Sequence, residues 1–306
     1  MEEKLQIPIG AVKDLKKSGY RIVGSHSGVE ICHWTKESLT SGRVCYKQRW
    51  YDIESHRCLE MSPAITFCTH QCQFCWRKLK WTISKEPKPD EPKDIIDGCI
   101  EARRLLLTGF KGNTKVDKKK WGEACKPTNA AISLAGEPTL YPRISDLIIE
   151  FHKRGFSTFL VTNGTRPDRL AKLEEEPTNL YISLCAQDRK TYLKVNRPLI
   201  SNGWKKLNES LELMKSFSCR KVIRITLVKG CNTENPEKYA KFIEKAEPDF
   251  IEPKAYVHVG ESQKRLPRES MPTMEIVREF AEKLADSTGY IIKDEDLPSK
   301  VVLLAK

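Results

Sequence analysis

Three cysteines follow one another closely in the segment "ITFCTHQCQFCWRK" (65–78), where Cys68, Cys72 and Cys75 form a CxxxCxxC pattern, here called the first cysteine set. Thiolates are metal ligands, and zinc takes four protein ligands in a structural site or three in a catalytic one. A cubane iron–sulfur cluster has four irons, so three cysteines hold it and leave one iron for an exogenous ligand. Ligation by cysteine alone favours the cluster, while His70 inside the loop keeps zinc as an alternative.

Three more cysteines, Cys32, Cys45 and Cys58, stand at equal intervals with twelve residues between neighbours and form the second cysteine set. Isolated cysteines are usually small core residues. The equal spacing and the polar, Trp- and Tyr-rich surroundings nevertheless predict a second three-cysteine cluster, with His33 and His56 as alternative fourth ligands. The remaining cysteines are interpreted as ordinary small hydrophobic residues: Cys99, Cys125, Cys185, Cys219 and Cys231.

Lys47 lies two positions after Cys45 and is the candidate catalytic residue. A lysine amine can form a Schiff base with a carbonyl compound, provided that the amine is neutral when it attacks the carbonyl. A three-thiolate cluster is anionic, and a nearby negative charge raises the pKa of a lysine. Burial or bound cationic groups must therefore oppose that effect if Lys47 is to act as a nucleophile.

The elements that position these residues alternate between strand and helix. Apolar runs typical of strands occupy residues 63–67, 130–136, 157–164, 179–186, 221–228 and 250–257. Helical apolar stripes lie between them, at Ile144, Leu147, Ile148 and Phe151 and again at Leu207, Leu211 and Met214. Such alternation predicts an α/β fold with a parallel sheet, either barrel-like or doubly wound. Residues 1–60 stand outside the pattern, and residues 82–94 are interpreted as a proline-rich surface connection.

In a parallel α/β sheet, functional residues gather at the carboxyl ends of the strands. The first cysteine set follows the first predicted strand, and "AGEPTL" (135–140) ends the second. Asn163 and Gly164 end the third strand, while Ser183 and Cys185 lie late in the fourth. We expect these residues to face a shared crevice.

The first cysteine set, Phe74 and the Gly136-Glu137-Pro138 run after a strand resemble the radical S-adenosylmethionine (SAM) superfamily, with Ala135 in place of its usual first glycine. The resemblance implies a partial (β/α)6 TIM-like barrel over residues 61–290, an N-terminal extension over 1–60 that carries the second cluster, and a C-terminal extension over 291–306. It also implies a [4Fe-4S] cluster on the first cysteine set, whose free iron chelates the methionine part of SAM. Reductive cleavage of SAM would then produce a 5′-deoxyadenosyl radical. The implied SAM contacts are Phe74, Gly136, Glu137, Pro138, Thr139, Asn163 and Ser183.

Within that superfamily, both cysteine sets, Lys47, "LAGEPTLYP" (134–142), "VTNGT" (161–165) and "VNRP" (195–198) resemble the stand-alone, archaeal-type enzymes of wyosine formation. The resemblance implies two [4Fe-4S] clusters and an external one-electron donor. It implies that N1-methylguanosine at position 37 of phenylalanine tRNA condenses with pyruvate to give the tricyclic base 4-demethylwyosine. The second cluster would bind pyruvate or be structural. Two alternatives stay open: another radical SAM RNA-modifying enzyme, or a zinc-containing RNA-binding protein.

Composition supports a polyanionic partner. The 306 residues carry a formal net charge of +12 with a pI near 9.1, which favours the approach of phosphates. Residues 110–127 hold six lysines around Trp121 and are either an RNA contact or a solvated loop. The candidate RNA-binding residues are Lys118, Lys119, Lys120, Lys264, Arg265 and Arg268.

The sequence has no apolar run of 18 residues and no apolar signal segment near its start, so we expect a cytosolic protein without a membrane partner. We also expect a monomer.

Overall fold

A computed structural model describes residues 5–306, so the first four residues of the predicted N-terminal extension lie outside the described residues. The chain forms two compact units, and each is described by itself. The first unit comprises residues up to 67 together with 85–160 and 173–178. The second comprises residues 68–84, 161–172 and 179–306. Because the two units interleave along the chain, the predicted division at residues 60 and 290 stays a prediction.

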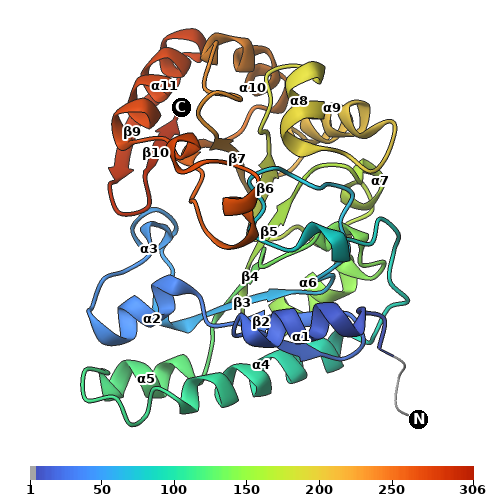
Figure 1. Cartoon of the computed structure of the whole chain (residues 1–306), viewed down its shortest axis with the longest axis vertical. Helices are drawn as coiled ribbons and strands as arrows, with labels where there is room; N and C mark the ends of the chain where they lie inside the picture. Colours follow the sequence, from blue (N-terminus) through green and yellow to red (C-terminus); the bar gives the residue numbers. More distant parts are fainter. Residues whose placement is uncertain (1–4) are drawn as a thin grey trace. The chain divides into compact units, whose positions relative to one another are not determined.

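The first unit is a sheet with helices packed on it (Figure 1). Its strands are β1 (Arg21–Val23), β2 (Ser27–Glu30), β3 (Cys58–Ser62), β4 (Asn129–Ile132) and β5 (Ser157–Thr162), whose last two residues are assigned to the second unit. Its helices are α1 (Ile9–Lys17), α2 (His33–Thr40), α3 (Tyr46–Tyr51), α4 (Pro92–Thr108), α5 (Lys118–Ala124) and α6 (Ile144–Lys153), with short 3₁₀ turns η1 (Ser55–Arg57) and η3 (Pro138–Leu140). Strands β1, β2 and β3 pair antiparallel in that order, and β3, β4 and β5 pair parallel. Helix α4 packs along β1, β2 and β3.

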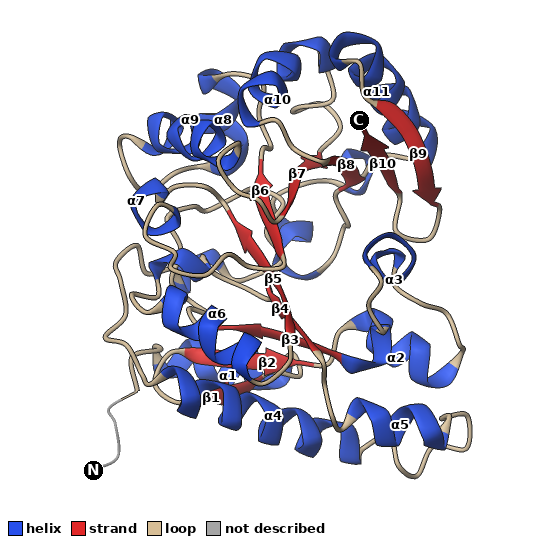
Figure 2. Cartoon of the chain, turned by 180° about the vertical axis from the view of Figure 1, so that it is seen from behind, coloured by secondary structure: helices blue, strands red, loops and turns tan. Residues whose placement is uncertain are grey.

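The second unit continues the strand–helix alternation (Figure 2). Its strands are β6 (Asn179–Ser183), β7 (Arg220–Leu227), β8 (Phe250–Ala255), β9 (Ile291–Asp296) and β10 (Val301–Ala305). Its helices are α7 (Pro167–Leu170), α8 (Arg189–Asn196), α9 (Gly203–Met214), α10 (Ala240–Ala246) and α11 (Met274–Thr288), with 3₁₀ turns η2 (Leu79–Trp81), η4 (Pro236–Tyr239), η5 (Gly260–Lys264) and η6 (Arg268–Ser270). Strands β6, β7 and β8 pair parallel, and β10 and then β9 extend this sheet antiparallel from β8. Helix α11 packs on β8, β9 and β10.

The first predicted strand is wrong in position. Residues 63–67 form no strand, and the first strand of the parallel run is β3, five residues earlier. Backbone N–H groups of residues 63–67 bond outside a strand ladder. Ile65 N–H donates to the His26 carbonyl at 3.1 Å, and Phe67 N–H donates to the Ala64 carbonyl at 3.0 Å. Proline has no N–H for a ladder, which is consistent with β3 ending just before Pro63.

The predicted helical stripes are confirmed. Ile144, Leu147, Ile148 and Phe151 are buried on α6, and Leu207, Leu211 and Met214 are buried on α9. Amphipathic helices place such residues on one face, which here packs into the core of each unit. Among the helices in residues 5–306, none has the length and apolarity needed to cross a membrane.

Candidate active site

The first cysteine set lies in a loop of the second unit, and each of its sulfurs faces a nitrogen from a different side chain. Asn163 Nδ2 lies 3.8 Å from Cys68 Sγ, and Asn196 Nδ2 lies 3.8 Å from Cys72 Sγ. Arg77 Nε donates to Cys75 Sγ at 3.4 Å. Hydrogen bonds to cysteine sulfur stabilise the thiolate form and are one of the features that set the potential of an iron–sulfur cluster.

The backbone of this loop is held by the end of α8. Gln71 N–H donates to the Asn196 carbonyl at 3.2 Å, and Gln73 N–H donates to the Val195 carbonyl at 2.9 Å. The buried His70 side chain makes a 2.6 Å hydrogen bond from Nε2 to the Tyr192 hydroxyl, also on α8. His70 Nε2 therefore has a protein partner, whereas Nδ1 is buried without a hydrogen-bond partner among the described residues.

The charges around the loop bear on whether its cysteines can bind a metal as thiolates. Burial, followed by the Cys68 and Cys75 sulfurs, holds the pKa of the Cys72 thiol well above its usual value. Burial alone would lower the pKa of Arg77, but Cys75, Cys68 and Cys72 raise it above the ordinary arginine value. The Cys72 thiol therefore does not ionise readily by itself, and a bound cationic centre would favour its thiolate form.

Neither cysteine set brings its three sulfurs as close together as one zinc ion requires. Sulfurs arranged tetrahedrally around one zinc lie about 3.8 Å apart. Within residues 5–306, the group of three ligand side chains whose donor atoms all lie within 4.8 Å is Glu54, His56 and Glu123, and neither cysteine set is that compact. Sulfurs that bind separate irons of a cubane stand further apart than sulfurs on one ion.

The predicted SAM residues divide between the two units. In the first unit, Gly136 adopts φ +76°, and a Cβ there would stand 1.8 Å from the Ala64 carbonyl oxygen. Glu137 is buried; its backbone N–H donates to the Phe67 carbonyl at 2.7 Å and its Oε1 accepts from the Thr139 hydroxyl at 2.7 Å. Pro138 is the first residue of η3 and is buried beside them. The "AGEP" turn is thus a rigid support for residues 64–67, immediately before the cysteine loop.

The other predicted SAM residues lie in the second unit. Asn163 contacts the first cysteine set, as described above. Phe74 packs against an apolar cluster of Val228, Tyr256 and Leu266. Ser183 is the last residue of β6 and pairs in register with Arg224 of β7. Whether these side chains contact SAM stays a prediction.

The second cysteine set lies at the starts of three elements of the first unit. Cys32 and Cys45 are the N-cap residues of α2 and α3, and Cys58 begins β3. Burial, Glu60 and the other two cysteines hold the pKa of Cys32 well above its usual value. Burial and Glu60 also raise the pKa of Cys58 to about 12, although nearby cations oppose the rise. Three elements within residues 32–62 therefore bring these thiols close enough to affect one another's pKa.

Lys47 lies in the first turn of α3, and its ammonium stands 4.4 Å from the centroid of the Phe159 ring. It interacts favourably with the thiolate form of Cys58 and with the Glu60 carboxylate. Glu60 lies directly opposite Glu30 in the β2–β3 pairing. Burial and the Glu30 charge raise the pKa of Glu60 to about 7.

Sequence reasoning missed several of these neighbours. Asn196 lies in the quoted "VNRP" segment, yet no local pattern shows that it reaches Cys72. Glu60 stands two positions after Cys58 within β3, and this spacing places both side chains on one face of the strand. Glu30 stands two positions before Cys32 at the end of β2. Arg77 lies two positions after Cys75 and has the same kind of signal.

The two histidines proposed as alternative fourth ligands have other contacts. His56 is buried and its Nε2 lies 2.8 Å from Glu123 Oε2. The His33 ring packs edge-on against Trp34 at a centroid distance of 5.1 Å. These contacts of the two histidines are therefore with Glu123 and Trp34, and neither is a cysteine.

The predicted RNA-binding residues have varied surroundings. Lys118, Lys119 and Lys120, the lysine triplet, form the first turn of α5, where the Asp117 carboxylate accepts from two of their backbone N–H groups. Trp121 is half-buried and donates from Nε1 to the Leu107 carbonyl at 2.9 Å, so its ring belongs partly to the core. Lys264 is exposed and pairs with Glu261 at 3.1 Å. Arg268 begins η6 and is exposed.

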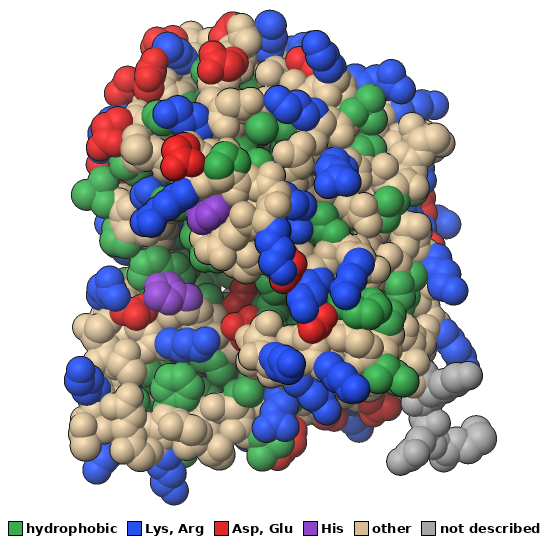
Figure 3. Space-filling view, viewed as in Figure 1, with side chains coloured by type: hydrophobic (Ala, Val, Ile, Leu, Met, Phe, Trp, Pro, Cys, Tyr) green, Lys and Arg blue, Asp and Glu red, His purple; other side chains and the backbone are tan. Residues whose placement is uncertain are grey.

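Arg265 stands apart from the other predicted RNA residues, because it is half-buried and donates to the carbonyls of Gln73 and Cys75. It thereby supports the loop of the first cysteine set. The space-filling view shows Lys and Arg side chains across most of the visible face, whereas acidic side chains gather over α11 at its upper left (Figure 3).

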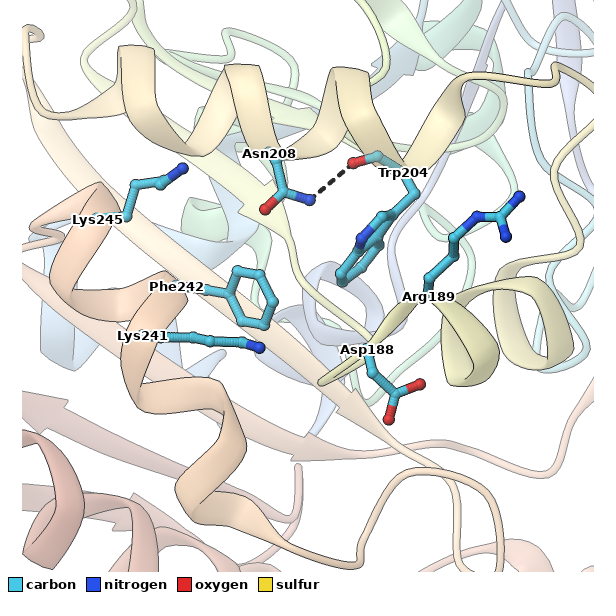
Figure 4. A pocket seen from close by; sticks show the side chains of 7 residues that line it. All are labelled: Asp188, Arg189, Trp204, Asn208, Lys241, Phe242 and Lys245. Atoms are coloured by element: carbon cyan, nitrogen blue, oxygen red, sulfur yellow. Dashed lines mark hydrogen bonds between the residues drawn. The ribbon is translucent and has the colours of Figure 1, made fainter.

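A cavity of about 370 Å³ lies among α8, α9 and α10 of the second unit. Figure 4 shows the rings of Trp204 and Phe242 at its centre, with Lys241 and Lys245 on the side of Phe242 and Arg189 on the side of Trp204. Asp188 and Asn208 complete the lining. Three cations beside two aromatic rings can accept an anionic group next to a planar one.

Comparison with known proteins agrees with this geometry. Residues 62–243 match the radical SAM superfamily, and residues 245–306 match a family described as wyosine base formation. The chain is therefore a radical SAM enzyme with the partial barrel of that superfamily, as predicted.

The S-adenosyl-L-methionine-dependent tRNA 4-demethylwyosine synthase of Pyrococcus horikoshii is 54% identical to the chain over 297 residues, which cover 95% of this chain and 87% of the relative. A structure of TYW1 with a lysine–pyruvate adduct bound matches with a TM-score of 0.90 at 36% identity, covering 98% of this chain and 96% of that one. A crystal structure of archaeal TYW1 matches with a TM-score of 0.81 at 33% identity, covering 98% and 96%. The chain belongs to the tRNA 4-demethylwyosine synthase family, and it acts in wyosine biosynthesis.

Proposed function

We propose that this enzyme condenses N1-methylguanosine at position 37 of phenylalanine tRNA with pyruvate to form 4-demethylwyosine. The observation that carries the proposal is Lys47, whose amine lies in the electrostatic neighbourhood of Cys58 and Glu60 in the first unit. A related structure, 36% identical, contains a lysine–pyruvate adduct. In this chain Lys47 is the lysine that the sequence singles out for that adduct.

The first cysteine set is proposed to hold the radical-generating [4Fe-4S] cluster, which when bound supplies the electron that cleaves SAM to a 5′-deoxyadenosyl radical. The protein's part is positioning. Asn163, Asn196 and Arg77 each face one sulfur with an N–H group, which stabilises the thiolates on which such a cluster depends. We propose Phe74, Asn163, Ser183 and the "AGEP" turn as the SAM-contacting residues.

Lys47 is proposed to attack the keto carbon of pyruvate and hold it as a Schiff base. The iminium is a better acceptor for the methyl carbon of the guanosine than the free ketone is. The methyl carbon would add after the 5′-deoxyadenosyl radical has removed one of its hydrogen atoms. The bond to the carboxylate carbon would then break, and this carbon would leave with the unpaired electron. The exocyclic amine of the guanosine would replace the Lys47 amine, so that two pyruvate carbons close the third ring and Lys47 is freed. The Phe159 ring beneath the lysine amine packs against one side of it and restricts the direction of attack.

The second cysteine set is proposed to hold a second [4Fe-4S] cluster beside Lys47. Its sulfurs come from the starts of α2, α3 and β3, so a cluster there would tie three elements together. An open iron would also offer the pyruvate carboxylate a ligand site next to the amine. Electrons are proposed to come from an external one-electron donor.

For the tRNA, we propose phosphate contacts from the lysine triplet, Lys264, Arg265 and Arg268, and from the basic cavity of Figure 4. The net charge of +12 favours such a partner. We further propose that the enzyme works as a monomer.

The covalent role of Lys47 is tested by borohydride trapping. The enzyme with pyruvate and borohydride is expected to gain one reduced pyruvyl group on the peptide that contains Lys47, and Lys47→Ala should eliminate both this adduct and the tricyclic product. Lys47→Arg should lose activity by about 100-fold or more, because a guanidinium keeps the charge but cannot act as a neutral amine. Mass spectrometry of the peptide and of the tRNA measures both effects.

Lys36→Arg is the matched control, because Lys36 lies in the same unit and pairs with Glu30 at 3.8 Å. Its turnover should stay within about threefold of the unmodified enzyme, as expected for a surface ion pair. Turnover of Lys47→Arg at the level of this control would reject the Schiff base.

A further inference from the structure

Arg103 on α4 is completely buried in the first unit, with a relative exposure of 0%. Its Nε donates to the Ala124 carbonyl at 3.1 Å, and its Nη2 donates to the His56 carbonyl at 2.7 Å. Its Nη1 has no hydrogen-bond partner among the described residues. A buried guanidinium is costly unless its donors and its charge are matched, so the orphaned Nη1 calls for an acceptor.

The ionisable groups around Arg103 indicate where such an acceptor would lie. Burial lowers the pKa of Arg103, and the groups that oppose this are, in order, Cys58, Cys32, Cys125 and Glu60. For the Cys58 thiol, Arg103 is the foremost nearby cation. Because Nη2 donates to the carbonyl of His56, two residues before Cys58, the guanidinium lies next to the segment that carries this cysteine.

We propose that Nη1 of Arg103 donates a hydrogen bond to a sulfur atom of an iron–sulfur cluster held by the second cysteine set, and that Arg103 raises the reduction potential of this cluster. The inference rests on the second cluster of the proposed function and adds a residue that tunes the reduction potential of that cluster. Arg103 is a positioning residue, since it acts on the cluster and not on a substrate.

The direction of the effect follows from charge. Three cysteinates around a [4Fe-4S]²⁺ core carry a net charge of about −1, and one-electron reduction takes this to about −2. A neighbouring positive charge stabilises the more negative, reduced state more than the oxidised one. Loss of Arg103 should therefore make the cluster harder to reduce.

The test uses the full-length chain carrying Cys68→Ala, Cys72→Ala and Cys75→Ala, so that the second cysteine set alone can hold iron. After anaerobic reconstitution, iron and sulfide are counted and the cluster is titrated by EPR against defined potentials. Arg103→Met is expected to lower the ratio of reduced to oxidised cluster at least tenfold at a fixed potential, which is about 59 mV for a one-electron couple. Arg103→Lys, which keeps the charge but not the planar fork, should fall between Met and Arg.

Arg104→Met is the matched control, because Arg104 is the next residue of α4, is half-exposed, and donates to the Cys125 carbonyl at 3.3 Å. It should leave the potential unchanged. A full iron content with an unchanged potential in Arg103→Met would overturn the role of Arg103. A triple-cysteine background without iron would instead reject the second cluster itself, so the two failures are distinguishable.

A third measurement needs no change at position 103. If the buried substitutions prevent folding or cluster assembly, the reduced triple-cysteine background is prepared with ¹⁵N-labelled arginine and studied by pulsed EPR. A hyperfine coupling from a guanidinium nitrogen and an exchangeable proton on the same bond are expected. An exchangeable proton without a nitrogen coupling would assign the contact to water and overturn the proposal.

Discussion

At the scale of single residues, the two cysteine sets differ in what surrounds their sulfurs. Each sulfur of the first set faces one side-chain nitrogen, from Asn163, Asn196 or Arg77. The second set lies among ionisable groups instead, namely Lys47, Glu60 and Arg103. Side-chain N–H groups favour thiolates in the first set, whereas charged groups of both signs surround Cys58 in the second.

This difference predicts that replacing a cysteine in one set removes the iron bound there and leaves the other set able to bind iron. Cys72→Ala should lose about half the iron and all reductive cleavage of SAM, since one iron of the radical-generating cluster loses its ligand. Cys45→Ala should also lose about half the iron but keep formation of 5′-deoxyadenosine. Cys99→Ala is the control, because Cys99 is a buried core residue of α4 outside both sets.

The measurement is iron content together with 5′-deoxyadenosine production under reducing, anaerobic conditions. Iron content in Cys45→Ala equal to that in Cys99→Ala would contradict a cluster on the second set. Continued SAM cleavage by Cys72→Ala would contradict the role of the first set.

At the scale of elements, the "AGEP" turn is held by a close approach that only glycine permits. Gly136 adopts φ +76°, and a Cβ at that position would stand 1.8 Å from the Ala64 carbonyl oxygen and 2.7 Å from that of Phe67. These carbonyls are backbone atoms and cannot rotate away. The turn therefore fixes the segment that leads into the first cysteine set.

Gly136→Ala is expected to lower the free energy of unfolding by several kcal/mol, roughly 1–2 from the left-handed backbone and the rest from the clash. Gly155→Ala is the matched control, since Gly155 has φ +75° with nothing within 4 Å of the added Cβ. It should cost only about 1–2 kcal/mol. Denaturant unfolding of both variants measures the difference, and equal losses would show that the close approach at Gly136 is unimportant.

A second element-scale feature is the buried network that ties the loop before α4 to the β1–β2 hairpin. His26 Nδ1 lies 2.6 Å from the Pro63 carbonyl, and Asp90 N–H donates to His26 Nε2 at 3.0 Å. One ring nitrogen donates and the other accepts, which requires the neutral imidazole. Burial lowers the pKa of His26 despite the nearby Asp90 carboxylate.

The lowered pKa of His26 predicts an acid-sensitive fold. The unfolded chain takes up a proton near pH 6.5 while the native protein does not, so the stability from the neutral ring is present above pH 6.5 and is lost as pH falls toward the native pKa. Anaerobic urea unfolding between pH 7.5 and 5.5 should show this decline, and His26→Asn should make it shallower. The same pH dependence in both proteins would assign the decline to other groups.

At the scale of the whole molecule, the excess positive charge predicts salt-dependent binding of tRNA. Each phosphate neutralised by the protein should contribute a slope of roughly −0.7 to −0.9 to the log–log plot of affinity against salt. Reversing the lysine triplet to glutamate should weaken binding by at least about tenfold and reduce this slope. Fluorescence anisotropy with tRNA at several salt concentrations measures both quantities.

The control for net charge is the triple change of Lys13, Lys16 and Lys17 to glutamate on the exposed side of α1, which alters the formal charge by the same amount. A loss confined to the lysine triplet supports a local contact. Equal losses in both variants would indicate only long-range attraction, and no loss in either would show that the lysines of residues 110–127 are solvated and do not contact RNA.

The sequence by itself determined the features that depend on local spacing. Cys68, Cys72 and Cys75 lie within one short loop, so their proximity follows from chain connectivity. The stripes of α6 and α9 follow from the helical period, and most strands follow from apolar runs between turns. The match to the "AGEP" turn is equally local. These features were sufficient to predict the family and the fold.

Only the tertiary structure decided which distant residues meet. The β2–β3 register places Glu30 opposite Glu60, and the packing of α4 brings Arg103 to Cys58, 45 positions away in the sequence. The end of α8 reaches back to Cys72 through Asn196. The first strand also began earlier than its apolar run suggested, because Ile65 N–H donates to His26 and Phe67 N–H donates to Ala64 within the same segment. Such contacts depend on how elements pack, and a linear pattern carries no information about the register between elements that lie far apart in the chain.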